Sequence, residues 1–112
     1  MAPLSIPDES QADSTRVVIG IGELTVQRSR SGVIITHALG SCLGVTVWDP
    51  LARVGGMLHA QLPSVLTCPD RAKLQIGLTV ELGIPALFRQ IYALGAEKTR
   101  LRVTAVGCAA IS

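Results

Sequence analysis

Apolar and polar residues alternate through the first half of the chain in a pattern typical of β-strands. The first strand-like run begins near Val17, and glycines at positions 20 and 22 indicate a bend within it. Clusters of Gly, Pro, Ser and Asp separate the runs, as turns do. Four stretches are therefore expected to be strands: 16–27, 33–39, 43–49 and 54–63.

Beyond the fourth run the apolar period lengthens to that of an α-helix. Leu74, Leu78 and Leu82 recur at intervals of four residues. Gly83 and Pro85 interrupt this pattern. Two helices or one broken helix are therefore expected, with Pro85 near the first turn of the second helix.

The remaining residues suggest a helix end, a last strand and a tail. Gly95 stands where a C-terminal helix cap belongs, and residues 98–107 alternate as a final strand. Residues 1–16 are expected to be a flexible tail and residues 17–112 a single domain. Strands, then helices, then a returning strand predict an α/β (α+β) fold. Its core is a largely antiparallel or mixed sheet with helices packed on the outer face.

Composition excludes several classes of protein. The chain has 112 residues, 48% of them hydrophobic, which is enough for one core. A formal net charge of +2 is too small to indicate nucleic-acid binding. No apolar run reaches the roughly 18–20 residues of a membrane span, and the acidic N-terminal stretch does not resemble a secretory signal. Three cysteines, with no CxxC pair, favour a reducing, cytoplasmic location.

Cys42 follows a tight turn and precedes an apolar strand, where a nucleophile can be presented. If the turn of the following hairpin is centred between Pro50 and Leu51, Cys42 faces His59 directly. A thiol beside an imidazole can form a thiolate–imidazolium pair, which supplies a nucleophile and a proton shuttle. A bulge in the second strand would shift this register.

A third residue should orient the imidazole, and Thr36 is the candidate because its hydroxyl can accept the ring N–H. Backbone N–H groups of the turn, at Gly40, Ser41 and Cys42, could stabilise an oxyanion, and Gly40 would allow the turn geometry that exposes them. His37 neighbours Thr36 and should point to the opposite strand face, so we interpret it as structural.

Each of these residues also has an ordinary structural interpretation. Cys42 alone is typical of a core cysteine, and His59 alone of a hydrogen-bonded structural histidine. Cys68 and Cys108 carry no assigned role. A zinc site built from the three cysteines and His59 fits no known ligand spacing, so no zinc site is expected.

Three segments together resemble the chemoreceptor glutamine deamidases (CheD). They are GIGE, ITHALGSCLGVTVWDP and GGMLHAQLP, in this order and spacing. Thr36, Cys42 and His59 occupy the positions of the family's threonine, cysteine and histidine. The resemblance implies a CheD-like cysteine-hydrolase fold and a cytoplasmic enzyme of chemotaxis. It implies deamidation of glutamines on chemoreceptors (methyl-accepting chemotaxis proteins), through a thioester on Cys42. It also implies no cofactor, no membrane insertion, and a CheC-type phosphatase as a further partner.

The chain departs from the family pattern at its end. The family's last strand leads to a GGA-x-M-like segment and a further C-terminal portion, whereas this chain reads GCAAIS, with Cys108 in place of a glycine. The family domain is therefore expected to be shortened at its C-terminus. An alternative function stays open: a short, non-catalytic homologue that binds the receptor or a CheC-like phosphatase.

Overall fold

The computed structural model describes residues 4–5, 16–29 and 31–108. Of the predicted N-terminal tail, only Leu4–Ser5 and Arg16 fall within these ranges, and both lie in strands. The strands are β1 Leu4–Ser5, β2 Arg16–Ile19, β3 Leu24–Arg28, β4 Val33–Thr36, β5 Leu43–Asp49, β6 Val54–Ala60 and β7 Arg102–Gly107. The helices are α1 Pro69–Leu74 and α2 Val80–Ala93, with 3₁₀ turns η1 Val65–Thr67, η2 Ile76–Leu78 and η3 Lys98–Arg100.

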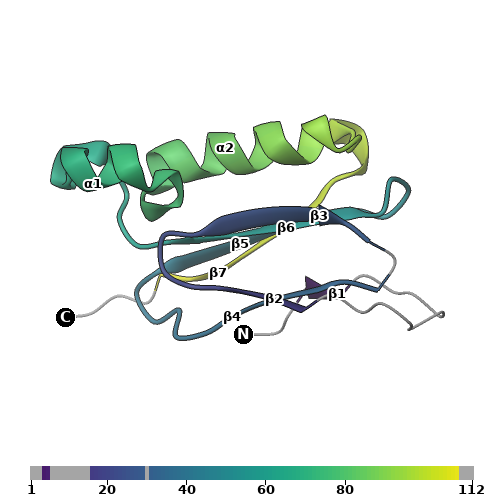
Figure 1. The fold of residues 1–112 in the computed structure, drawn as a ribbon, viewed down its shortest axis with the longest axis horizontal. Coiled ribbons are helices and arrows are strands. Elements are labelled where there is room, and N and C mark those ends of the chain that lie inside the picture. Colours follow the sequence, from purple (N-terminus) through teal and green to yellow (C-terminus); the bar gives the residue numbers. More distant parts are fainter. Residues whose placement is uncertain (1–3, 6–15, 30, 109–112) are drawn as a thin grey trace.

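These elements form three layers (Figure 1). The larger sheet has the strand order β3-β6-β5-β7 and is antiparallel throughout. The helices cover one of its faces, and a smaller sheet of order β1-β4-β2 covers the other. In the smaller sheet β2 runs parallel to β4 and β1 antiparallel to it. The predicted α+β fold, with a largely antiparallel, mixed sheet core and helices on the outer face, is confirmed.

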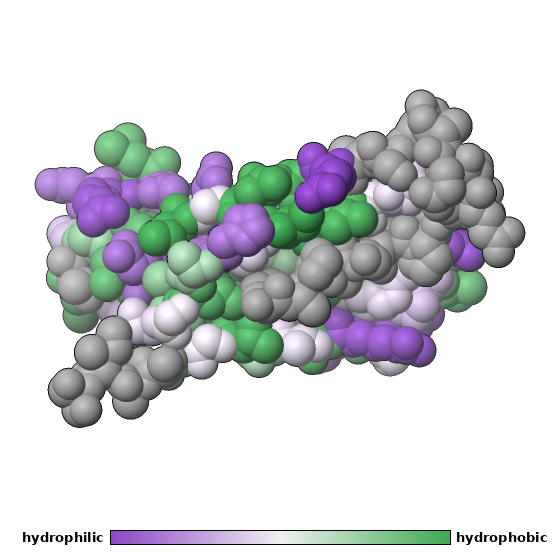
Figure 2. Space-filling model, turned by 90° about the horizontal axis from the view of Figure 1, so that it is seen from below, coloured by the Kyte–Doolittle hydropathy of each residue, from purple (hydrophilic) through white to green (hydrophobic). Residues whose placement is uncertain are grey.

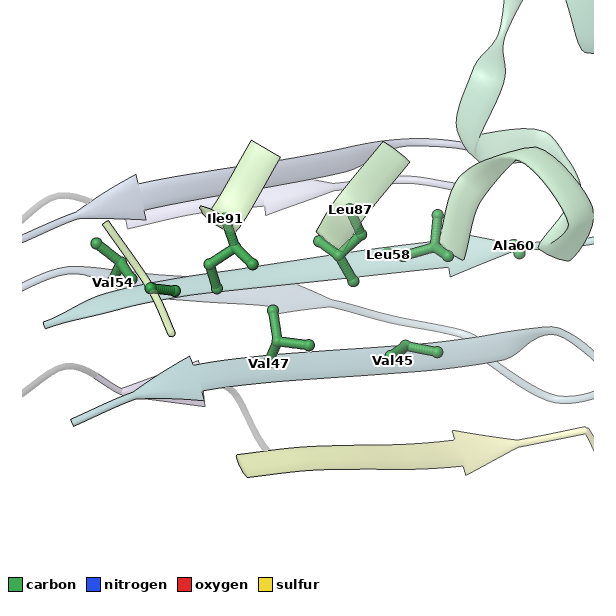
Figure 3. Close-up of a cluster of buried hydrophobic side chains, with 8 residues drawn as sticks. Val45, Val47, Val54, Leu58, Ala60, Leu87 and Ile91 are labelled. Carbon is green, nitrogen blue, oxygen red and sulfur yellow. The ribbon is translucent and has the colours of Figure 1, made fainter. Parts of the chain in front are cut away.

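The main core lies between α2 and the larger sheet. Leu87 and Ile91, one helical turn apart, point from α2 onto β5 and β6, where they meet Val47 and Leu58 (Figure 3). All seven residues of β6 are buried, because this strand is covered on both faces. Adjacent residues point to opposite faces of a strand, so Leu58 faces the helix while its neighbours face the smaller sheet.

The helical region was predicted correctly in type but wrongly at its break. The hydroxyl of Thr79 accepts a hydrogen bond from the N–H of Leu82, 3.2 Å away, and so starts α2 before the expected interruption. Gly83 allows α2 to pack closely on β6, since a Cβ there would lie 2.9 Å from a methyl carbon of Leu58. Pro85 consequently lies inside α2 rather than near its first turn.

The predicted helix end at Gly95 is confirmed. Gly95 has a φ of +104° and donates its N–H to the carbonyl of Tyr92 at 3.0 Å, while Ala96 donates to Ile91 at 3.2 Å. This pair of bonds is a Schellman motif, which requires a left-handed residue that glycine supplies at little cost.

The first predicted strand is in fact two strands, β2 and β3, which belong to different sheets. The bend expected at Gly20 and Gly22 is a full turn, closed by a 3.1 Å bond from the N–H of Glu23 to the carbonyl of Gly20. This turn carries the chain from the smaller sheet into the larger one (Figure 1).

The predicted register of the β5–β6 hairpin is wrong by two residues. Asp49 pairs with Val54, so four residues form the turn instead of two. The Asp49 carboxylate sets this turn by accepting the N–H groups of Leu51 at 3.0 Å and Ala52 at 3.1 Å. Arg53 completes it with a φ of +56° and donates its N–H to the Asp49 carbonyl at 2.9 Å.

Asp49 also ties this turn to the segment that leads into β7. Its carboxylate accepts the N–H of Glu97 at 2.9 Å and lies 2.9 Å from a guanidinium nitrogen of Arg100, whose Nε–H it also accepts. The Arg100 guanidinium, helped by the backbone N–H groups, holds the pKa of Asp49 well below its usual range despite complete burial.

Seen from the side of the smaller sheet, the molecule has apolar residues near the centre of its surface (Figure 2). Val18 of β2 is 60% exposed, and Val33 and Ile35 of β4 are half-buried. Among the described residues, no helix is both long and apolar enough to cross a membrane.

Candidate functional site

Thr36 and His59 meet between the two sheets and form a direct hydrogen bond. Thr36 ends β4, His59 lies in β6, and the Thr36 Oγ1 to His59 Nδ1 distance is 2.8 Å. Both side chains are buried, with exposures of 2% and 0%. The structure thus brings together two of the three residues that the sequence suggests for catalysis.

The bonding of Thr36 fixes which ring nitrogen of His59 carries the proton. The Thr36 hydroxyl donates its hydrogen to the backbone carbonyl of Ile19 at 2.8 Å. It can therefore act only as an acceptor toward His59, and Nδ1 must be the protonated nitrogen. Burial lowers the pKa of His59 below its ordinary 6.5 and so favours the neutral ring. In that tautomer Nε2 is a free base.

Nε2 of His59 is buried and has no hydrogen-bond partner within the described part of the chain. Cys42 lies one residue before β5, and the predicted direct opposition of Cys42 and His59 is wrong. His59 pairs with Gly44, and Cys42 precedes Gly44 by two residues. If the ladder is extended by one residue, Cys42 takes a position diagonal to His59, for which a separation of about 7–8 Å is typical.

The backbone of His59 is held by the turn between β2 and β3. Gly22 donates its N–H to the His59 carbonyl at 2.6 Å, and His59 donates its own N–H to Glu23 at 2.9 Å. The Glu23 carboxylate accepts the N–H of Gly20 at 2.5 Å and so closes the turn. Sequence reasoning did not assign this positioning role, although the GIGE run was its visible signal.

The turn before Cys42 is the proposed source of oxyanion donors. Cys42 already donates its N–H to the carbonyl of Leu39 at 2.5 Å, so that donor is occupied. Gly40, with a φ of +39°, and Ser41 are both exposed, and their N–H groups bond to no other described residue. An oxyanion role for Gly40 and Ser41 stays a prediction.

The other residues considered in the sequence, His37, Cys68 and Cys108, lie outside strands β4 and β6. His37 follows β4 and is exposed, whereas the adjacent Thr36 is buried. Cys68 lies at the start of α1, and Cys108 is exposed just beyond β7. All three cysteines are free, and the described residues contain no group of three or more His, Cys, Asp or Glu that could hold a metal ion.

Comparison with known proteins adds sequence relatives to this geometry. No protein-family model matches the chain. It is 48% identical over 91 residues to the probable chemoreceptor glutamine deamidase CheD 2 of Anaeromyxobacter dehalogenans, covering 81% of this chain and 57% of that protein. It is 39% identical over 95 residues to the probable CheD 1 of Syntrophus aciditrophicus, covering 85% and 59%.

A third relative is the chemoreceptor glutamine deamidase CheD of Thermotoga maritima, 36% identical over 94 residues, with 84% of this chain and 57% of that protein covered. The chain thus spans somewhat more than half the length of these curated relatives. Its similarity to all three over most of its own length shows that the chain belongs to the CheD family.

Proposed function

We propose that this chain hydrolyses the side-chain amide of glutamines on chemoreceptors, with Cys42 as nucleophile, His59 as base and acid, and Thr36 as orienter. One observation carries the proposal: the bond between Thr36 and His59, which leaves Nε2 as a buried base without a partner among the described residues. The relatives' names supply the substrate class, chemoreceptor glutamine.

The reaction follows from the tautomer of His59. Nε2 takes the proton of the Cys42 thiol, and the thiolate attacks the carboxamide carbon of the substrate. The imidazolium then gives its proton to the departing nitrogen, so that ammonia leaves and a thioester remains. Water next loses a proton to Nε2 and attacks the thioester, which releases glutamate and restores the thiol.

Thr36 contributes by holding the ring through each proton transfer. Its hydroxyl hydrogen is committed to the carbonyl of Ile19, so the oxygen always faces the Nδ1–H of His59. When Nε2 gains a proton, this same bond stabilises the imidazolium without rearrangement. Catalytic hydrogen bonds are often long before substrate binds, so a close approach of Cys42 and His59 is expected in the substrate complex.

The direct test is to incubate the protein with receptor fragments and to measure ammonia release and the glutamine-to-glutamate mass increase. Wild-type protein should produce both, and Cys42→Ala should produce neither while keeping the wild-type circular dichroism spectrum. Cys68→Ala is the matched control, because Cys68 lies at the start of α1, and it should retain activity. Equal activity in Cys42→Ala and the wild type would exclude this mechanism.

A non-catalytic binding module is the alternative, and thiol reactivity separates the two functions. Cys42 is only 7% exposed, which is typical of an unreactive core cysteine. Thiol alkylation of Cys42 well below pH 8, lost in His59→Ala, supports the enzyme. A rate that is the same in both proteins supports the module. Binding of a CheC-type phosphatase and a cytoplasmic location both stay predictions.

A further inference from the structure

Cys42 and Cys108 each lie one residue beyond the paired ends of β5 and β7. The β5–β7 ladder pairs Leu43 with Gly107, and the same register places Cys42 opposite Cys108 one step further along. The two backbones are still in contact at that point, because the N–H of Cys108 donates to the carbonyl of Cys42 at 2.7 Å, while the N–H of Cys42 donates to Leu39. The two strands lie side by side at the edge of the larger sheet (Figure 1).

The backbone at Gly107 makes this close approach possible. Gly107 has a φ of +99°, and a Cβ at this position would lie 2.2 Å from the carbonyl oxygen of Cys42. No side chain fits there, so glycine alone lets the end of β7 reach Cys42. Cys108 follows with a φ of +59°, which turns its backbone away from the extended conformation while its N–H stays bonded to Cys42.

The resulting separation suits a disulfide. Residues that exchange two backbone bonds between antiparallel strands have Cα atoms about 5.5 Å apart, and one such bond joins Cys108 to Cys42. Disulfides span Cα separations of about 4.4–6.8 Å. Both thiols are free in the structure, and Cys108 is exposed, so its side chain can rotate toward Cys42.

We propose that Cys108 is a resolving cysteine, which forms a reversible disulfide with Cys42 when a hydroperoxide oxidises the site. The disulfide should also switch off deamidation, and this second effect rests on the proposed function of Cys42. Formation of the disulfide does not depend on that function. Cys108 is an exposed thiol whose backbone bonds to that of Cys42, and redox-sensitive cysteines often have a resolving cysteine beside them.

Two balanced steps lead to the disulfide. The Cys42 thiolate attacks the terminal peroxide oxygen, the O–O bond breaks, and the alkoxide or hydroxide leaves and takes up a proton. The sulfur is thereby oxidised by two electrons to the sulfenic acid, and the peroxide is reduced. The Cys108 thiolate then attacks the Cys42 sulfur, the S–O bond breaks, and hydroxide leaves as water after protonation. A thiol reductant restores both cysteines by exchange.

The test treats the reduced chain with a small excess of hydrogen peroxide and then maps its peptides by mass spectrometry without reduction. The expected product has lost two hydrogen atoms and contains a peptide cross-link between Cys42 and Cys108. Deamidation of receptor fragments should fall together with cross-link formation and return with dithiothreitol. Cys68→Ser is the matched control and should behave like the wild type, because Cys68 lies outside the β5–β7 ladder.

Cys108→Ser separates the resolving role from simple oxidation of Cys42. This variant should lose the cross-link, and peroxide should drive its Cys42 to sulfinic acid, with a loss of activity that dithiothreitol does not reverse. Absence of the cross-link in the wild type, or a cross-link between Cys42 and Cys68 instead, would overturn the proposal. Because the cross-link is read by mass, a chain without deamidase activity can still confirm it or contradict it.

Discussion

Two buried titratable side chains lie at opposite ends of the β5–β6 hairpin and differ in how fully their polar atoms are bonded. Asp49 lies at the turn and His59 toward the open end, and both side chains are fully buried. His59 has one bonded ring nitrogen and one that bonds to no described residue. The Asp49 carboxylate, in contrast, accepts N–H groups from Leu51, Ala52, Glu97 and Arg100.

The difference is the one expected between a structural group and the proposed catalytic base. A buried polar atom without a partner costs about 1–3 kcal/mol, so folds rarely retain one without a reason. The bonds of Asp49 stabilise the hairpin turn and its link to β7, and they leave nothing available for a substrate. The Nε2 of His59, which bonds to no described residue, makes the fold less stable, and this is the compromise expected if it serves as the proposed base.

The largest effect is expected on the rate of catalysis, when Nε2 of His59 is removed. His59→Gln replaces the ring with an amide that cannot shuttle protons, and it should reduce ammonia release about 10²–10⁴-fold. The matched control is His37→Gln, at an exposed position next to Thr36, which should keep wild-type rates. Equal losses in the two variants would show that His59 is not a special base. The measurement is the rate of ammonia release from receptor fragments at a fixed pH.

The next largest effect is expected on the free energy of unfolding, when the fully hydrogen-bonded carboxylate of Asp49 is removed. Asp49→Ala removes the acceptor for four backbone and side-chain donors and should cost about 3 kcal/mol of unfolding free energy in urea. Glu97→Gln is the matched control, because Glu97 also pairs with Arg100 but is 65% exposed, and it should cost well under about 1 kcal/mol. Similar losses in both variants would contradict the contrast drawn between the two ends of the hairpin.

These two residues also show what the sequence could and could not predict. The strands, the helical region and the cap at Gly95 follow from local periodicity and turn chemistry. The hairpin register does not, because the Asp49 carboxylate accepts the N–H groups of Leu51 and Ala52 and Arg53 adopts a left-handed φ, which together make a four-residue turn that a two-residue turn rule does not anticipate. The local turn rule alone therefore placed Cys42 opposite His59, two positions from its actual place.

The face on which the site residues lie was nevertheless predictable. A shift of two residues returns each side chain to the same side of a strand, so alternation along β5 still assigns the position of Cys42 to the face of His59. The bond from Thr36 to His59 was expected from the residue types. The carbonyl of Ile19, which fixes the tautomer, was not, because nothing in the sequence shows where a backbone carbonyl of another strand will point.

A smaller effect is expected when the bonded nitrogen of His59 loses its partner. Thr36→Val keeps the shape of the side chain but removes the acceptor of Nδ1–H, and it should cost about 1–3 kcal/mol of transition-state stabilisation. The acidic limb of the pH–rate profile should move to lower pH, because the imidazolium loses a bond that favours it. Thr36→Ser should restore both the rate and the profile. A rate loss with an unchanged profile in Thr36→Val would indicate a merely structural role.

The smallest effect is on the pH dependence of stability, where burial of His59 should be visible without any substrate. Because the pKa of His59 is lowered in the folded protein, the unfolded chain binds more protons once the pH falls toward 6.5. The free energy of unfolding should therefore be highest above pH 6.5 and decrease from there down to the folded-state pKa, after which this contribution stays constant. Urea unfolding between pH 8 and 5 should show the decrease in the wild type and in His37→Gln. In His59→Gln the decrease in the free energy of unfolding should be smaller, because no buried imidazole remains to resist protonation. A curve for His59→Gln that matches the wild type would mean that His59 is not held neutral by burial.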